Sequence, residues 1–144
     1  MITRAIVRSL SKISSLLEIA TGKAAHLRTG SRGEEDAYFH LKGLGYVMVA
    51  RNYRSPRRRG EIDLIGWEDG MLCFIEVKTR TNIQVASPEA AVDADKKEDL
   101  ARMAREYLWH LKRVPPYRFD VITVFYPESE PPQFTLFRNA FFIA

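Results

Sequence analysis

The feature that most constrains the fold is a pair of apolar runs separated by Asp69-Gly70, in the stretch GEIDLIGWEDGMLCFIEVKTR over residues 60–80. Asp-Gly between two such runs is typical of a two-residue β-hairpin turn. With these two residues as the loop, residues whose numbers sum to 139 face each other across the hairpin. The sequence therefore predicts two antiparallel strands in a fixed register.

The predicted register gathers charged side chains at the end of the hairpin away from the turn. Asp63 lies opposite Glu76, and Glu61 lies opposite Lys78. Because side chains alternate between faces, these four share one face, which continues toward the turn with Ile65, Trp67, Leu72 and Phe74. The other face is entirely apolar, with Ile62, Leu64, Gly66, Cys73, Ile75 and Val77. Both faces are thus expected to be covered, as in central strands.

Three carboxylates beside one lysine leave negative charge unbalanced at this end of the sheet. Facing like charges repel across a strand pair, and partial burial adds to the cost. A divalent cation would relieve the repulsion, because hard cations such as Mg²⁺ bind through one or two carboxylates plus water. The alternative is a polar ladder at the sheet end, with an exposed Glu61–Lys78 ion pair and solvated acids.

The rest of the chain supplies helices and strands around this hairpin. We expect a helix over 33–43, a strand over 46–53, a helix from an N-cap at Asp93 to about Lys112, and strands over 118–126 and 134–143. The order helix, three strands, helix, two strands predicts an α/β fold with a mixed five-stranded sheet flanked by helices. Glu34 lies on the buried stripe of the first helix, whereas Glu35 and Asp36 are expected to complement the helix dipole.

The N-terminal 30 residues form a separate predicted region. Residues 2–20 have an apolar helical stripe, and TGKAAHLRTGSRG over 21–33 has the composition of a basic linker. We therefore divide the chain into an N-terminal amphipathic helix and linker over 1–30 and a folded domain over 31–144. The helix is expected to pack on the domain or on a second copy, which would give a homodimer. A membrane-surface helix and an organellar targeting peptide remain open alternatives.

The composition excludes several classes of protein. The single cysteine, Cys73, cannot form an internal disulfide, which favours a reducing cytoplasm. No apolar run approaches the ~18 residues of a membrane-spanning helix. The three histidines show no spacing typical of zinc ligands.

Positive charge is concentrated before the hairpin. Residues 1–60 carry a net charge of +8 and the remainder −4. Four arginines stand immediately before the charged hairpin end, and Arg80 and Lys96 follow it; the four are Arg54, Arg57, Arg58 and Arg59. Such residues can contact the phosphates of a nucleic acid without reading its sequence. The alternative is a solvated loop.

Seven ordered motifs resemble the YraN family, an uncharacterised bacterial family with an expected restriction-endonuclease-like fold. They are GEEDA, ARNYR, GEIDLI, FIEVKTR, SPEAAV with Lys96 following, RFDVI and RNAF, over about residues 31–142. Glu34 on a helix, Asp63 on a strand and Glu76-Val77-Lys78 on the next also resemble the PD-(D/E)xK nuclease constellation. Ile62 stands where that motif has proline, which is not a ligand.

The resemblance implies a nuclease that uses Mg²⁺ or Mn²⁺. Asp63 and Glu76 would hold the metal, Glu34 would complete the site, and Lys78 would orient or help deprotonate the attacking water. Glu61 would be either a further ligand or a partner of Lys78. The implied substrate is a phosphodiester, in DNA rather than RNA, in a branched or damaged structure. Two other functions stay open: a nucleic-acid-binding module whose site is inactive or needs a partner, and an interaction protein that assembles through its first helix.

Overall fold

The computed structural model describes residues 25–57, 59–80 and 92–142. The helix expected over 2–20, and the dimer expected from it, lie outside these residues. Within them the elements are α2 (Ala25–Gly43), β1 (Val47–Tyr53), β2 (Ile62–Glu68), β3 (Met71–Arg80), α4 (Ala94–Trp109), β4 (Tyr117–Phe125) and β5 (Gln133–Phe141). In this part of the chain, neither helix is long and apolar enough to cross a membrane.

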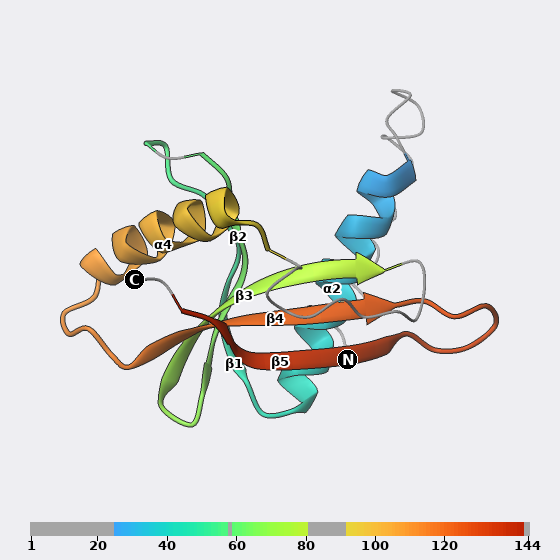
Figure 1. Cartoon of the computed structure of the whole chain (residues 1–144). Coiled ribbons are helices and arrows are strands. Elements are labelled where there is room, and N and C mark those ends of the chain that lie inside the picture. The colour runs from blue at the N-terminus through green and yellow to red at the C-terminus, as the bar shows by residue number, and fades with distance from the viewer. Residues whose placement is uncertain (1–24, 58, 81–91, 143–144) are drawn as a thin grey trace.

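The strands form one mixed sheet in the order β1-β2-β3-β4-β5 (Figure 1). β3 and β4 are parallel, and every other neighbouring pair is antiparallel. The parallel pair needs a crossover connection, and α4 lies within it. The predicted α/β class and order of elements are therefore confirmed, and the architecture is consistent with a restriction-endonuclease-like fold.

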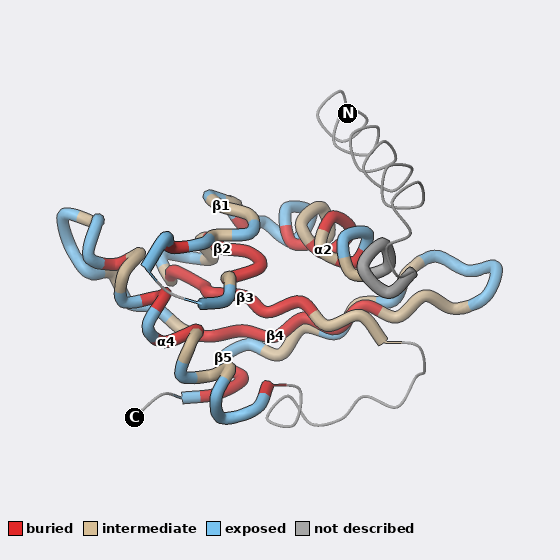
Figure 2. The backbone as a smooth tube through the Cα atoms, turned by 90° about the horizontal axis from the view of Figure 1, so that it is seen from above, coloured by how far each residue is buried: buried red, intermediate tan, exposed pale blue. Residues whose placement is uncertain are grey.

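The helices cover opposite faces of the sheet, and the central strands between them are buried (Figure 2). Under α4 the apolar side chains include Ile65, Phe74 and Val121, packed with Leu100 and Met103 of the helix. Under α2 a second cluster includes Leu64, Ile75 and Ile122. Two apolar layers therefore hold β2, β3 and β4 on both sides.

The hairpin has the predicted register from Glu68↔Met71 to Leu64↔Ile75. The predicted division between the faces is also correct, with one exception at Ile62. Strict alternation places Ile62 with Leu64, but Ile62 packs in the cluster under α4. The alternation fails because the Asp63 side chain enters the ladder at this point, where its Oδ2 accepts a hydrogen bond of 2.8 Å from the Val77 amide.

The helix predicted over 33–43 is α2, and it begins at Ala25, eight residues earlier than predicted. Most of the expected linker, residues 25–33 of 21–33, is thus helical, and the boundary between residues 30 and 31 falls inside α2. The misleading signal was Gly33, which marks a close contact and not a loop. A Cβ at Gly33 would lie 2.2 Å from Thr79 Oγ1 on β3, so only glycine lets the helix approach the strand this closely.

The earlier helix start also corrects the interpretation of the acids on α2. No acid lies in its first turn, so the prediction that Glu35 and Asp36 complement the helix dipole is wrong. Both are buried, at 4% and 6% exposure, whereas Glu34 is only half-buried. Asp36 instead accepts a 2.8 Å hydrogen bond from the Tyr126 hydroxyl.

A buried ionic network fixes the sheet at the turn end of the hairpin. The Arg118 guanidinium contacts Asp120 at 2.8 Å and Glu68 at 2.6 Å. Asp120 is fully buried and also accepts from the Asn139 amide, at 2.8 Å. Arg138 reaches the same Glu68 from β5 at 2.7 Å, but its side chain is half exposed. The network therefore ties β2, β4 and β5 together.

We predict opposite effects for alanine at the two glycines of α2. Gly30→Ala should stabilise the protein by about 0.5–1 kcal/mol, because nothing lies within 4 Å of the new Cβ. Gly33→Ala should destabilise it by about 1 kcal/mol or more through overpacking against Thr79. Chemical denaturation measures both. Thr79→Ala should rescue Gly33→Ala, and a Gly33→Ala protein as stable as wild type would contradict the contact.

Arg118→Leu should lower the free energy of unfolding by about 3 kcal/mol, because it leaves the Asp120 carboxylate buried without its cation. Arg138→Ala is the matched control, since it removes an arginine from the same Glu68 at a half-exposed position and should cost at most about 1 kcal/mol. Urea unfolding of both proteins provides the comparison. If the two variants lose equal free energy of unfolding, burial of the Arg118–Asp120 pair does not determine how much the pair stabilises the fold.

Candidate metal centre

Three carboxylates from distant parts of the sequence meet at the end of the hairpin away from its turn. Glu34 comes from α2, Glu61 precedes β2 and Asp63 lies within β2. One oxygen of each lies within 4.8 Å of the others. Asp63 is buried and the other two are half-buried. This spacing suits oxygen ligands around a single small cation.

Asp63 is held in place by the main chain of the neighbouring strand. Its Oδ2 accepts the Val77 N–H at 2.8 Å, which joins β2 to β3 beyond the last paired residues of the ladder. This bond fixes the carboxylate while using only one of its two oxygens. A rigid carboxylate is a better preorganised ligand than a freely rotating one.

Glu76 lies on β3 beside Asp63 and is 2% exposed. Its Oε1 contacts two ammonium groups, Lys78 Nζ at 3.4 Å and Lys96 Nζ from the first turn of α4. Its Oε2 is buried and has no hydrogen-bond partner among the described residues. A buried carboxylate oxygen without a partner is costly unless another group binds it.

The acids raise one another's pKa values. Burial, then the neighbouring Glu61 carboxylate, raises the pKa of Glu34 to about 7. Burial, then the Glu76 carboxylate, raises the pKa of Asp63 well above its ordinary range. Burial lowers the pKa of Lys96, but the Glu76 carboxylate outweighs this effect and raises it overall. The site therefore favours added positive charge, from protons or from a cation.

Glu61 pairs with a different residue from the one predicted. The sequence register places it opposite Lys78, but its Oε2 lies 2.7 Å from Arg54 Nη2. The reason is that β2 begins only at Ile62, so Glu61 is outside the strand ladder and follows the loop. Lys78 turns to Glu76 instead.

The structure brings only some of the predicted basic residues to the acids. Lys96 contacts Glu76 directly, and Arg54 contacts Glu61. Arg57 and Arg59 are exposed on the loop, and Arg80 ends β3 half-buried. Arg58 lies outside the described residues. Their contact with a nucleic acid stays a prediction.

The site opens into a cleft of about 380 Å³ at the start of α4. Asp93, Asp95 and Asp99 line it together with Asp63 and Lys96. Asp95 and Asp99, one helical turn apart, were not predicted as site residues, and Asp93 was predicted only as a helix cap. Arg51, whose charge lowers the pKa of Glu34, was not predicted either. Arg51 faces Leu64 across the β1–β2 pair. A shift of register between Met48 and Ala50 hides that pairing from the sequence.

The residues present fit a hard divalent cation. The donors are carboxylate oxygens, which Mg²⁺ and Mn²⁺ prefer. The unpartnered Glu76 Oε2 and the raised pKa values of Glu34 and Asp63 are the features that a bound cation would relieve. Glu34, Glu61 and Asp63 have the spacing to share such a cation. Glu76 is not part of that group of three, although it lies beside Asp63, and its role as a ligand stays a prediction.

The description of the family model that matches residues 33–124 is "Uncharacterised protein family UPF0102". The chain belongs to this family. The motifs that resemble the YraN family therefore identified it correctly, since UPF0102 is the YraN family. The matched range contains all four predicted catalytic residues, Glu34, Asp63, Glu76 and Lys78.

Individual UPF0102 proteins are similar over most of the chain. One from Koribacter versatilis is 51% identical over 83% of this chain and 82% of its own length. One from Solibacter usitatus is 42% identical over 78% and 84%. A third, from Symbiobacterium thermophilum, is 47% identical over 67% and 81%. Their names state the family and no reaction.

We predict that Mn²⁺ stabilises the protein more at pH 8 than at pH 5. Raised carboxylate pKa values mean that the folded state binds extra protons, so the metal-free protein loses stability as pH rises from about 4.5 to 7. Protons compete strongly with the metal at pH 5 and much less at pH 8, because the pKa of Glu34 is raised to about 7 and that of Asp63 to about 8. Thermal unfolding with and without Mn²⁺ measures the shift.

Asp63→Asn should remove most of this Mn²⁺ effect. Asp69→Asn is the matched control, because it makes the same chemical change at the exposed hairpin turn. An equal stabilisation at both pH values, or one retained in Asp63→Asn, would contradict a metal centre at these acids.

Proposed function

We propose that this UPF0102 protein is a divalent-metal-dependent nuclease that hydrolyses phosphodiester bonds in DNA, in branched or damaged structures. The observation that carries the proposal is the state of Glu76. It is a buried carboxylate beside Asp63, with one oxygen against two lysines and the other without a partner among the described residues. Metal-dependent hydrolysis of a phosphodiester requires acids that hold a cation, and lysines next to them that face the phosphate.

When bound, the metal would lower the pKa of a coordinated water and offset charge on the phosphodiester. Asp63 and Glu76 would hold it from adjacent strands, and Glu34 would reach it from α2. Because Asp63 is fixed by the Val77 amide and Glu76 is buried in β3, their oxygens require little rearrangement on binding.

The two lysines differ from Glu76 in their exposure. Their side chains are 27% and 40% exposed, whereas that of Glu76 is 2% exposed. An incoming phosphate can thus reach both ammonium groups while Glu76 stays buried. Lys78 is the candidate to orient the attacking water and to exchange its proton, and Lys96 is the candidate to neutralise phosphate charge.

The acidic cleft supports a requirement for metal. Asp93, Asp95 and Asp99 line it with Asp63 and would repel a phosphodiester that arrived without a cation. A bound divalent cation would offset part of this negative charge. The metal is therefore needed for the substrate to approach as well as for the chemical step.

One observation favours a second candidate, a nucleic-acid-binding module without catalysis. Lys78 and Lys96 already neutralise Glu76 in the structure, so the site has compensation that needs no metal. This module would bind DNA in EDTA and would leave the DNA intact when metal is added.

Cleavage of labelled linear, branched and single-stranded DNA with Mg²⁺, Mn²⁺ or EDTA tests the proposal. We expect metal-dependent cleavage that falls by at least about 100-fold in Asp63→Asn, Glu76→Gln and Lys78→Met, since each removes a metal ligand or the positioning of the water. Glu98→Gln, an exposed acid on α4, is the control for lost charge and should retain activity. Full activity in Asp63→Asn would refute the mechanism, and binding without cleavage in wild type would favour the second candidate.

A further inference from the structure

A second hollow lies farther along α4 from the acidic cleft, beside the loop that follows β1. It has a volume of about 700 Å³, and we call it the arginine groove. The lining residues that matter here are Tyr53, Arg57, Arg102, Arg105, Trp109 and His110. One acid, Glu106, also lines it. The groove is thus rich in positive charge and aromatic rings, where the cleft is rich in carboxylates.

The cleft and the groove follow one another along the same side of α4. Asp95 and Asp99 line the cleft, and Arg102, Glu106 and Trp109 line the groove. These positions are three or four residues apart and therefore form one helical stripe. The loop is common to both hollows, since Gly60 and Glu61 line the cleft while Pro56 and Arg57 line the groove.

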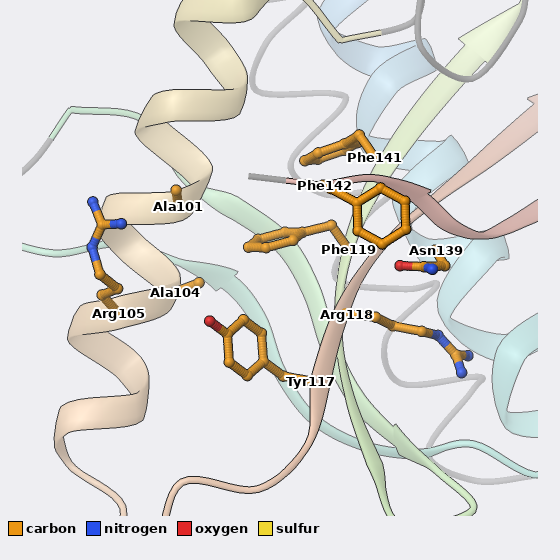
Figure 3. Close-up of a pocket in the computed structure, with 9 residues that line it drawn as sticks. All are labelled: Ala101, Ala104, Arg105, Tyr117, Arg118, Phe119, Asn139, Phe141 and Phe142. Carbon is orange, nitrogen blue, oxygen red and sulfur yellow. The ribbon is translucent and has the colours of Figure 1, made fainter. Parts of the chain in front are cut away.

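The arginines of the groove are available to a ligand. Arg102 makes only long ion pairs, 3.8 Å to Glu98 and to Asp99. Within the described residues, no ion pair holds Arg57 or Arg105. Arg105 also lines a third hollow, of about 250 Å³, together with Phe119 and Phe141 (Figure 3), and its side chain is exposed.

Trp109 is the most exposed large apolar side chain described, at 85%. The last residue of α4 presents this indole beside two arginines and Tyr53. An exposed tryptophan among arginines is unfavourable in water but suits a partner with flat apolar rings and a charged backbone. Nucleobases joined by phosphates have both properties.

We propose that the arginine groove binds a single-stranded DNA segment and directs it into the acidic cleft, with a base stacked on Trp109 and phosphates on Arg102, Arg105 and Arg57. The proposal rests on the nuclease function for its choice of DNA. The exposed ring favours a single strand, because duplex bases present no free face for stacking.

The dimensions fit this occupant. Asp95 to Trp109 spans about 21 Å at 1.5 Å per residue. At ~3.4 Å per nucleotide of a stacked strand, this length holds about six nucleotides. The nuclease would therefore act on DNA that has a single-stranded segment next to the cleavage position, such as a flap or a splayed end.

Binding of labelled oligo(dT) of roughly 12 nucleotides, followed by fluorescence anisotropy in EDTA, tests the proposal. Trp109→Ala should raise the Kd by about tenfold through loss of stacking, and Trp109→Phe should recover part of the affinity. Phe142→Ala is the control, because Phe142 is 81% exposed but lies outside the groove. Its affinity should match wild type.

The salt dependence of the Kd tests the phosphate contacts separately. The double variant Arg102→Gln with Arg105→Gln should reduce the slope of log Kd against log salt concentration by about 1.4, at ~0.7 per phosphate on a single strand. Lys42→Gln removes an exposed charge from α2 on the other face of the sheet and should leave the slope unchanged.

Three results would overturn the groove assignment: unchanged affinity in Trp109→Ala, blunt duplex DNA bound as tightly as oligo(dT), or oligo(U) bound more tightly than oligo(dT). Each is measured without metal and is repeated in Asp63→Asn, so none depends on cleavage. Intact oligo(dT) binding without cleavage would refute the nuclease alone. Cleavage that is unaffected by Trp109→Ala, with unchanged binding, would refute the groove alone.

Discussion

The arrangement of the candidate site depends on one hydrogen bond, from the Val77 amide to Asp63 Oδ2. A side chain here accepts the hydrogen bond that a main-chain carbonyl would accept in a regular ladder, so β2 and β3 stay joined while the carboxylate is drawn between them. The bond turns Ile62 toward α4 and places Asp63 next to Glu76. The packing of the strand and the geometry of the acids therefore have the same cause.

The same solution recurs at the other side of the sheet, where Asp120 Oδ1 accepts the Asn139 amide within an irregular stretch of the β4–β5 pair. The two aspartates differ in what compensates their charge. Asp120 has the Arg118 guanidinium at 2.8 Å, and so it is structural. Asp63 has carboxylates as its nearest charged neighbours. This difference separates a residue that stabilises the fold from one whose charge still needs a partner.

Local signals in the sequence predicted the hairpin register, the order of helices and strands along the chain and the N-cap of α4 at Asp93, because turn chemistry and alternation act over a few residues. They also placed Asp63, Glu76 and Lys78 together. They failed where the cause lies far away in sequence. Gly33 has the local signature of a helix boundary, and only its contact with Thr79, 46 residues away, explains a glycine inside α2. The pairing of Glu61 depends on the path of the 54–61 loop, and the arginine groove depends on how that loop lies against α4.

The contact at Gly33 also determines how precisely α2 is positioned. Elsewhere in the core, the distance between a helix and the sheet depends on side-chain volume, which substitution changes readily. Gly33 has no side chain, so the helix main chain packs directly against the Thr79 side chain of β3, and the distance here depends on that one small residue. Glu34 is the next residue along the helix. The position of the Glu34 carboxylate relative to Asp63 therefore depends on a contact that has no room for one added methyl group at Gly33.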